Sequence, residues 1–239
     1  MKCFYGSFPR IYDKHIEATD FYPSYIKTYI DRDVRMVRNI TDYSAFTRFL
    51  KFCAGRCSQI LNVTALAEDA GITRKTAEAW LSVLETSYII YLLRPYYKNF
   101  GKRIIKNPKL YFYDTGLDCS LLGLENPQQI ETFYMRGALF ENFAVSELVK
   151  KRIFHGKSDE LYFWRDSNGI EVDVIEEDST ELKAYEIKPA ETMNTAFFSN
   201  IKKVKEIASI KNENTAVIYS RKSLKATKEN GAYICWKEL

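Results

Sequence analysis

The sequence lacks several features that would place it in a membrane, secreted or zinc-binding class. It has no run of about 18 apolar residues, and its first residues (MKCFYG) lack the apolar stretch of a secretion signal. Its five cysteines form no Cys-x-x-Cys pair, and its two histidines lie far from them in the sequence. We therefore predict a soluble, cytoplasmic protein with reduced thiols, no membrane association and no zinc site.

An excess of charge of one sign is also missing. The 239 residues carry a formal net charge of only +4, which does not separate a DNA-binding protein from other soluble proteins. The distribution of basic residues is more informative, because five of them fall in one short window interleaved with aromatic residues and asparagines. That mixture suits phosphate contact, although a solvated loop is an equally good interpretation. The five residues are Lys98, Lys102, Arg103, Lys106 and Lys109.

Changes of pattern along the chain predict a mixed α/β protein in three parts. These are an N-terminal helical segment (1–41), a winged-helix-like domain with the basic and aromatic loop (42–117) and a nuclease-like domain (118–239). In the middle part, three helices in series lead into an apolar strand at 88–93, an order typical of a winged helix-turn-helix. The outward positions of the third helix mix acids with bases. We therefore favour packing against neighbours or a partner protein over base-specific reading by this helix.

From residue 135 the pattern becomes helix, strand, strand, strand, helix, strand. Because side chains alternate along a strand, Asp173 on the second strand can meet Glu186 and Lys188 on the third. Two carboxylates can hold a hard divalent cation, Mg²⁺ or Mn²⁺, that activates water and neutralises a phosphate. Lys188 would stabilise charge, and Glu141 on the preceding helix is a candidate additional ligand. For the triplet alone, an exposed sheet face with a salt bridge is the alternative interpretation.

The order of these elements resembles the core of the PD-(D/E)xK nuclease superfamily over roughly residues 135–220. This resemblance implies a restriction-endonuclease-like αβββαβ domain in the C-terminal part of the chain. Asp173, Glu186 and Lys188 match the superfamily's last three motif positions, and Glu141 matches the less specific first one.

Three segments of the wider chain carry a second resemblance: residues 25–34 (YIKTYIDRDV), 106–117 (KNPKLYFYDTGL) and 137–142 (GALFEN). They are similar to the C-terminal region of a bacterial and archaeal AAA-type ATPase family that carries domain of unknown function 4143. Members usually have a P-loop ATPase domain ahead of this region, yet no G-x-x-x-x-G-K-[ST] motif occurs here. We therefore expect no ATPase activity from this chain, and either an ATPase partner or a missing N-terminal ATPase domain.

Two functions compete on these grounds. The first is a divalent-metal-dependent deoxyribonuclease, with Asp173, Glu186 and Glu141 as metal ligands and Lys188 as the charge stabiliser. The second is a non-catalytic DNA-binding or protein-interaction module of an AAA-type ATPase system. A transcription regulator that uses the winged helix alone is a third reading, but the basic recognition helix it would need is absent.

Overall fold

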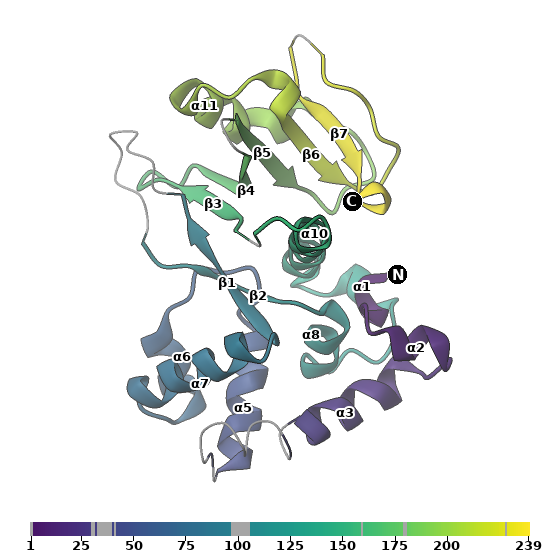
Figure 1. Cartoon of the computed structure of the whole chain (residues 1–239), viewed down its shortest axis with the longest axis vertical. Coiled ribbons are helices and arrows are strands. Elements are labelled where there is room, and N and C mark those ends of the chain that lie inside the picture. The colour runs from purple at the N-terminus through teal and green to yellow at the C-terminus, as the bar shows by residue number, and fades with distance from the viewer. Residues whose placement is uncertain are drawn as a thin grey trace. The chain divides into compact units, whose positions relative to one another are not determined.

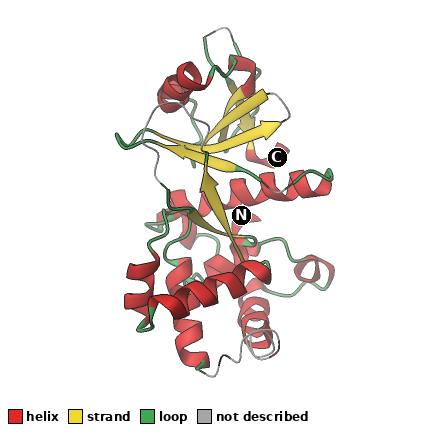
Figure 2. Ribbon diagram, turned by 60° about the vertical axis from the view of Figure 1, so that its left-hand side comes forward, coloured by secondary structure: helices red, strands yellow, loops and turns green. Residues whose placement is uncertain are grey.

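The chain folds into two compact units. The computed structural model describes residues 2–29, 32, 40, 42–96, 106–158, 160–178, 181–227 and 229–239. Unit 1 comprises residues 1–92 and 109–143, and unit 2 comprises residues 93–108 and 144–239. Residues 42 and 118, at which the sequence places domain boundaries, both belong to unit 1. The helices, together with a mixed sheet ordered β2-β1-β3-β4-β5-β6-β7, confirm the mixed α/β class (Figures 1 and 2).

Helices make up most of unit 1. Its helices and strands, with the first parts of β1 and α10, are α1 (Lys2–Tyr5), α2 (Pro9–Asp13), α3 (Ala18–Tyr29), α5 (Tyr43–Ala54), α6 (Val63–Ala70), α7 (Arg74–Thr86), β1 (Ile90–Pro95), β2 (Lys109–Phe112), α8 (Thr115–Leu121), α9 (Gln129–Thr132) and α10 (Arg136–Phe154). Among the described residues, no helix is long and apolar enough to cross a membrane.

Local capping explains where α5, α6 and α7 begin. The side chains of Asp42, Asn62 and Thr73 each accept a hydrogen bond from the backbone N–H three residues further on, which satisfies a donor that the helix leaves free. Gly71 ends α6 in the left-handed conformation with φ +70°, which glycine adopts without strain. The Trp80 ring of α7 then packs edge-on against Phe46 and Phe49 of α5, with centroid separations of 5.2 and 5.4 Å.

Asp114 connects the N-terminal segment to the rest of unit 1 by hydrogen bonds. Its carboxylate accepts hydrogen bonds from Ser7 N at 2.6 Å, the Tyr22 hydroxyl at 2.7 Å and Leu117 N at 3.0 Å. Gly116 lies against the same tyrosine, because a Cβ added there would stand 2.2 Å from the Tyr22 oxygen. Asp114 and Gly116 therefore hold α3 in place through their contacts with Tyr22.

A twisted sheet forms the centre of unit 2. Besides the end of β1, its elements are the last part of α10, β3 (Tyr162–Arg165), β4 (Glu171–Asp178), β5 (Glu181–Ile187), η2 (Thr195–Phe198), α11 (Ser199–Ala208), η3 (Asn212–Asn214), β6 (Thr215–Tyr219), β7 (Ala232–Cys235) and η4 (Trp236–Glu238). Strand β3 runs parallel to the end of β1 and antiparallel to β4, and β4 is antiparallel to β5. Strands β5, β6 and β7 are parallel. Strand β7 was not part of the sequence prediction.

The turn between β3 and β4 follows from its sequence. Asp166 accepts hydrogen bonds from the backbone N–H groups of Asn168 and Ile170, and Gly169 takes a φ of +82° that a residue with a Cβ rarely adopts. This turn sets the register that brings Asp173 to its place on β4.

The two faces of the sheet in unit 2 carry different chemistry. Val174 pairs with Tyr185, and Glu176 with Lys183, so these four side chains share one face. The neighbouring positions Asp173 and Glu186 lie on the other face by strand alternation. On that second face, apolar residues of α11 such as Ile201 and Val204 pack into a hydrophobic core cluster with Ile175 and Ala184.

Candidate functional site

The structure brings together three of the four predicted site residues, Asp173, Glu186 and Lys188. Asp173 on β4 and Glu186 on β5 are 7% and 4% exposed. The Lys188 Nζ atom lies 2.8 Å from Glu186 Oε1 and 4.0 Å from Asp173 Oδ2. Asp173 Oδ2 also accepts a hydrogen bond from Ile187 N at 2.8 Å, which fixes the carboxylate against the end of β5.

Burial and a neighbouring negative charge govern the ionisation of Glu186. Removal from water, followed by the charge of Asp173, raises the pKa of Glu186 to about 8, and Lys188 opposes this rise. Glu186 Oε2 is buried without a hydrogen-bond partner in the part of the chain that the structure describes. The site therefore holds a buried carboxyl oxygen that a bound cation or a proton could satisfy.

Glu141 lies in unit 1, on the first half of α10. Its Oε1 atom accepts hydrogen bonds from Lys109 Nζ at 2.9 Å and from the Tyr111 hydroxyl at 2.6 Å, both on β2. The Lys109 side chain is only 3% exposed, so this ion pair is largely shielded from water. Glu141 thus has hydrogen-bond partners within unit 1, and its role as an additional metal ligand stays a prediction.

The five basic residues predicted to contact nucleic acid differ in where the structure places them. Lys98, Lys102 and Arg103 lie outside the described residues, and Lys106 is exposed. Lys109 differs from the expected loop position, because it belongs to strand β2 and its ammonium is buried against Glu141. A buried and paired ammonium cannot reach a DNA phosphate from this position, so Lys109 is withdrawn from the predicted nucleic-acid contacts.

Glu171 is a neighbour that the sequence prediction missed. It lies two residues before Asp173 on β4, where strand alternation puts both side chains on one face. Its charge contributes to the raised pKa of Glu186, and its Oε2 atom pairs with Arg165 Nη1 at 2.9 Å. The period-two pattern that found Asp173 could also have indicated Glu171.

The donor set suits a cation that keeps part of its hydration shell. Within the described residues, no three side chains of the types His, Cys, Asp and Glu group closely enough to enclose a metal. Mg²⁺ does not require such an enclosure, because it is often held by one or two carboxylates with water and phosphate oxygens completing its shell. Asp173 and Glu186 fit that mode of binding.

Comparison with known families identifies both parts of the chain. A family model described as Domain of unknown function (DUF8612) matches residues 1–128, more than half of the 239 residues. The chain belongs to this family. In this DUF8612 protein, a second model, Domain of unknown function (DUF4143), matches residues 136–239, which confirms that part of the resemblance seen in the sequence.

Two curated mycobacterial proteins are similar to this DUF8612 chain. They are "Uncharacterized protein Mb2031c" of Mycobacterium bovis and "Uncharacterized protein Rv2008c" of Mycobacterium tuberculosis, each 29% identical over 168 residues. The match covers 70% of this chain but 37% of each relative, so the chain spans little more than a third of their length. No solved structure matches the chain significantly.

Proposed function

We propose that this DUF8612 protein handles DNA and that unit 2 carries a Mg²⁺- or Mn²⁺-dependent site for phosphodiester hydrolysis. The observation that carries the proposal is the buried pair of Asp173 and Glu186 with Lys188 beside it, together with the partnerless Glu186 Oε2. Two like-charged groups in a buried site are costly unless a cation or a proton compensates them. The order α10, β3, β4, β5, α11, β6 supports the nuclease-like reading of this unit.

Each residue has a chemical task in this proposal. Asp173 and Glu186 would supply the carboxylate oxygens that a hard divalent cation prefers, and such a cation would activate water and neutralise a phosphate when bound. Lys188 holds Glu186 through Oε1 and is about one-third exposed, so its ammonium can donate to a phosphate oxygen at the edge of the site. The Ile187 N–H keeps Asp173 in one orientation.

A second candidate function is a non-catalytic DNA-binding or protein-interaction module. The arrangement α5, α6, α7 and β1 supports a winged-helix-like part, and the exposed face of α7 carries an ion pair between Arg74 Nε and Glu78 Oε1 at 2.8 Å. Such a mixed surface is poorly suited to base reading, which favours packing against a protein partner, such as an ATPase, for this helix.

A cleavage assay separates these functions. The wild-type protein should nick plasmid or cut single-stranded DNA in the presence of Mg²⁺ or Mn²⁺. Lys188→Ala should still bind Mn²⁺ but lose about a hundredfold or more in cleavage rate, because lysine acts on the phosphate or water. Lys203→Ala, which removes an exposed lysine of α11, is the matched control and should cleave normally.

Two outcomes would count against the nuclease proposal. Full activity in Lys188→Ala would remove the lysine from the mechanism. No cleavage of any DNA or RNA form by the wild-type protein, in spite of bound Mn²⁺, would leave the non-catalytic module as the function.

A further inference from the structure

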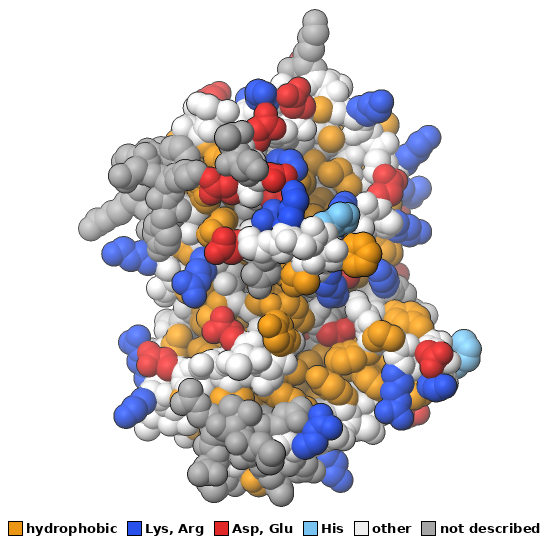
Figure 3. Space-filling model, in the orientation of Figure 1, with side chains coloured by type: hydrophobic (Ala, Val, Ile, Leu, Met, Phe, Trp, Pro, Cys, Tyr) orange, Lys and Arg blue, Asp and Glu red, His pale blue; other side chains and the backbone are white. Residues whose placement is uncertain are grey.

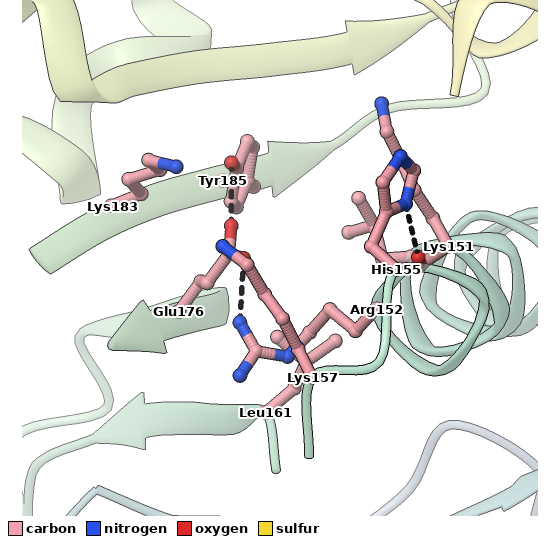
Figure 4. A pocket seen from close by; sticks show the side chains of 9 residues that line it. Lys151, Arg152, His155, Lys157, Leu161, Glu176, Lys183 and Tyr185 are labelled. Atoms are coloured by element: carbon pink, nitrogen blue, oxygen red, sulfur yellow. Dashed lines mark hydrogen bonds and ion pairs between the residues drawn. The ribbon is translucent and has the colours of Figure 1, made fainter. Parts of the chain in front are cut away.

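A cavity of about 250 Å³ lies in unit 2 on the sheet face opposite Asp173 and Glu186. Strands β4 and β5 contribute Glu176, Lys183 and Tyr185 to its wall, and the last turns of α10 lie across from them (Figure 4). The remaining lining residues are Leu148, Lys151, Arg152, His155, Lys157 and Leu161. Figure 3 shows Lys and Arg side chains, with Asp and Glu side chains among them, on this face of unit 2. Neither the proposed nuclease site nor the basic window uses any of these residues.

Positive charge exceeds negative charge around the cavity. Four of its lining residues are cations: Lys151, Arg152, Lys157 and Lys183. The carboxylates that balance them are Glu176, 2.6 Å from Arg152, and Asp178, which lies 2.8 Å from Lys157 and 3.6 Å from Lys183. Among these described residues, four cations against two carboxylates leave an excess of two positive charges, without counting His155. A dianion would neutralise that excess.

Arg152 is held rigidly at the cavity. Its side chain is 9% exposed, Nε donates to Ser158 O at 2.8 Å, Nη1 donates to Glu176 at 2.6 Å and Nη2 lies 3.5 Å from Ser158 Oγ. Because a guanidinium has five N–H donors, these three bonds leave two for a ligand. The guanidinium is therefore oriented before any ligand arrives, which lowers the entropic cost of binding.

Glu176 is occupied on both of its oxygens. Oε1 is taken by Arg152, and Oε2 accepts a hydrogen bond from the Tyr185 hydroxyl at 3.0 Å. Burial and the charge of Glu176 raise the pKa of Tyr185 above its usual range, so this hydroxyl stays protonated and keeps donating. Glu176, the carboxylate among the described residues that line the cavity, is thus compensated by Arg152 and Tyr185.

We propose that this cavity binds a phosphate monoester group. A phosphate monoester carries close to two negative charges at neutral pH, which matches the excess, and lysine and arginine are its usual protein donors. The cavity, at about 250 Å³, is slightly smaller than the 300–1,000 Å³ or so of typical ligand pockets, which suits a phosphate with an attached sugar. A free sugar phosphate and the terminal phosphate of a nucleic-acid strand both present this chemistry.

Titration calorimetry with ribose 5-phosphate tests the proposal. Lys151→Gln and Lys183→Gln should each weaken binding at least tenfold, because each removes one charge of the excess. Lys202→Gln is the matched control, because Lys202 is an exposed lysine on α11, which packs against the other face of the sheet. This variant should bind ribose 5-phosphate like the wild type. Asp173→Asn should also bind normally, which separates this site from the proposed nuclease site. Circular dichroism verifies that each variant is folded.

A second arm identifies the source of the phosphate. A short single-stranded oligonucleotide is titrated with either a 5′-phosphate or a 5′-hydroxyl end. Tighter binding of the phosphorylated strand, lost in Lys183→Gln, supports the proposal with a strand end as ligand, and binding of ribose 5-phosphate alone supports it with a free sugar phosphate. Absence of binding by both phosphate probes at millimolar concentration, or equal affinity in Lys151→Gln, Lys183→Gln and the wild type, would overturn it.

Discussion

Replacing Glu186 by glutamine should change how the stability of the protein depends on pH. Glutamine keeps the shape of the side chain and cannot ionise. In the wild-type protein, folding raises the pKa of Glu186 from 4.5 to about 8 because the side chain is buried beside Asp173. The folded state therefore binds more protons than the unfolded state between these two pH values, so the free energy of unfolding falls as the pH rises through this window.

The size of the effect follows from the same two values. For each pH unit between 4.5 and about 8, the contribution of Glu186 to the free energy of unfolding falls by about 1.4 kcal/mol. The wild-type protein should therefore lose up to about 5 kcal/mol of stability from Glu186 between pH 4.5 and pH 8, and Glu186→Gln should lose none of it. The free energies of unfolding of the two proteins should differ least at pH 5, since Glu186 is still protonated in the folded state.

Urea denaturation followed by circular dichroism measures this difference. Stability curves are collected from pH 5 to pH 9 for the wild type, for Glu186→Gln and for Glu181→Gln. Glu181 is the matched control, because it is an exposed glutamate on the same strand and binds Lys211 and Asn214. The free energy of unfolding of Glu186→Gln, relative to that of the wild type, should increase as the pH rises. Parallel curves for these two proteins would refute the reasoning.

Two further predictions concern unit 1. Trp80→Ala should lower the free energy of unfolding by about 3 to 5 kcal/mol, since it leaves a cavity beside Phe46 and Phe49, whereas Lys75→Ala on the exposed face should cost almost nothing. Thermal melts and DNA titrations on the Trp80→Ala and Lys75→Ala variants check this prediction. A folded Lys75→Ala protein without DNA affinity would mean that α7 reads DNA. Asp114→Asn should cost about 2 to 4 kcal/mol, since the charge that accepts hydrogen bonds from Ser7, Tyr22 and Leu117 is lost; a change below about 0.5 kcal/mol in a urea titration would contradict that role.

Local rules in the sequence account for the convergence of Asp173, Glu186 and Lys188. Side-chain alternation and a short connection between adjacent antiparallel strands leave few alternatives for where these residues lie. The caps at Asp42, Asn62 and Thr73 are equally local, since each depends on a contact three residues away. Such short-range constraints can be read from residue types and spacing alone.

Contacts between distant segments could not be predicted in the same way. The pairing of Lys109 with Glu141 spans 32 residues, and nothing in the basic window indicates that this lysine, unlike Lys106, turns inward from a strand. The basic cavity likewise combines the end of α10 with β5, two segments that look like ordinary solvated surfaces in the sequence. The packing of α10 against this face of the sheet brings their charges together.

Binding of Mn²⁺ between Asp173 and Glu186 is the most direct test of the proposed site. Crystals of the wild-type protein and of Asp173→Asn would be soaked in Mn²⁺ at pH 8, where Glu186 is about half ionised in the absence of a cation. An anomalous difference peak should appear between the two carboxylates in the wild type and be absent in the variant, whose amide retains the shape but lacks the charge. No peak at this position in the wild type, or an equal peak in Asp173→Asn, would contradict the metal site and with it the proposed hydrolysis.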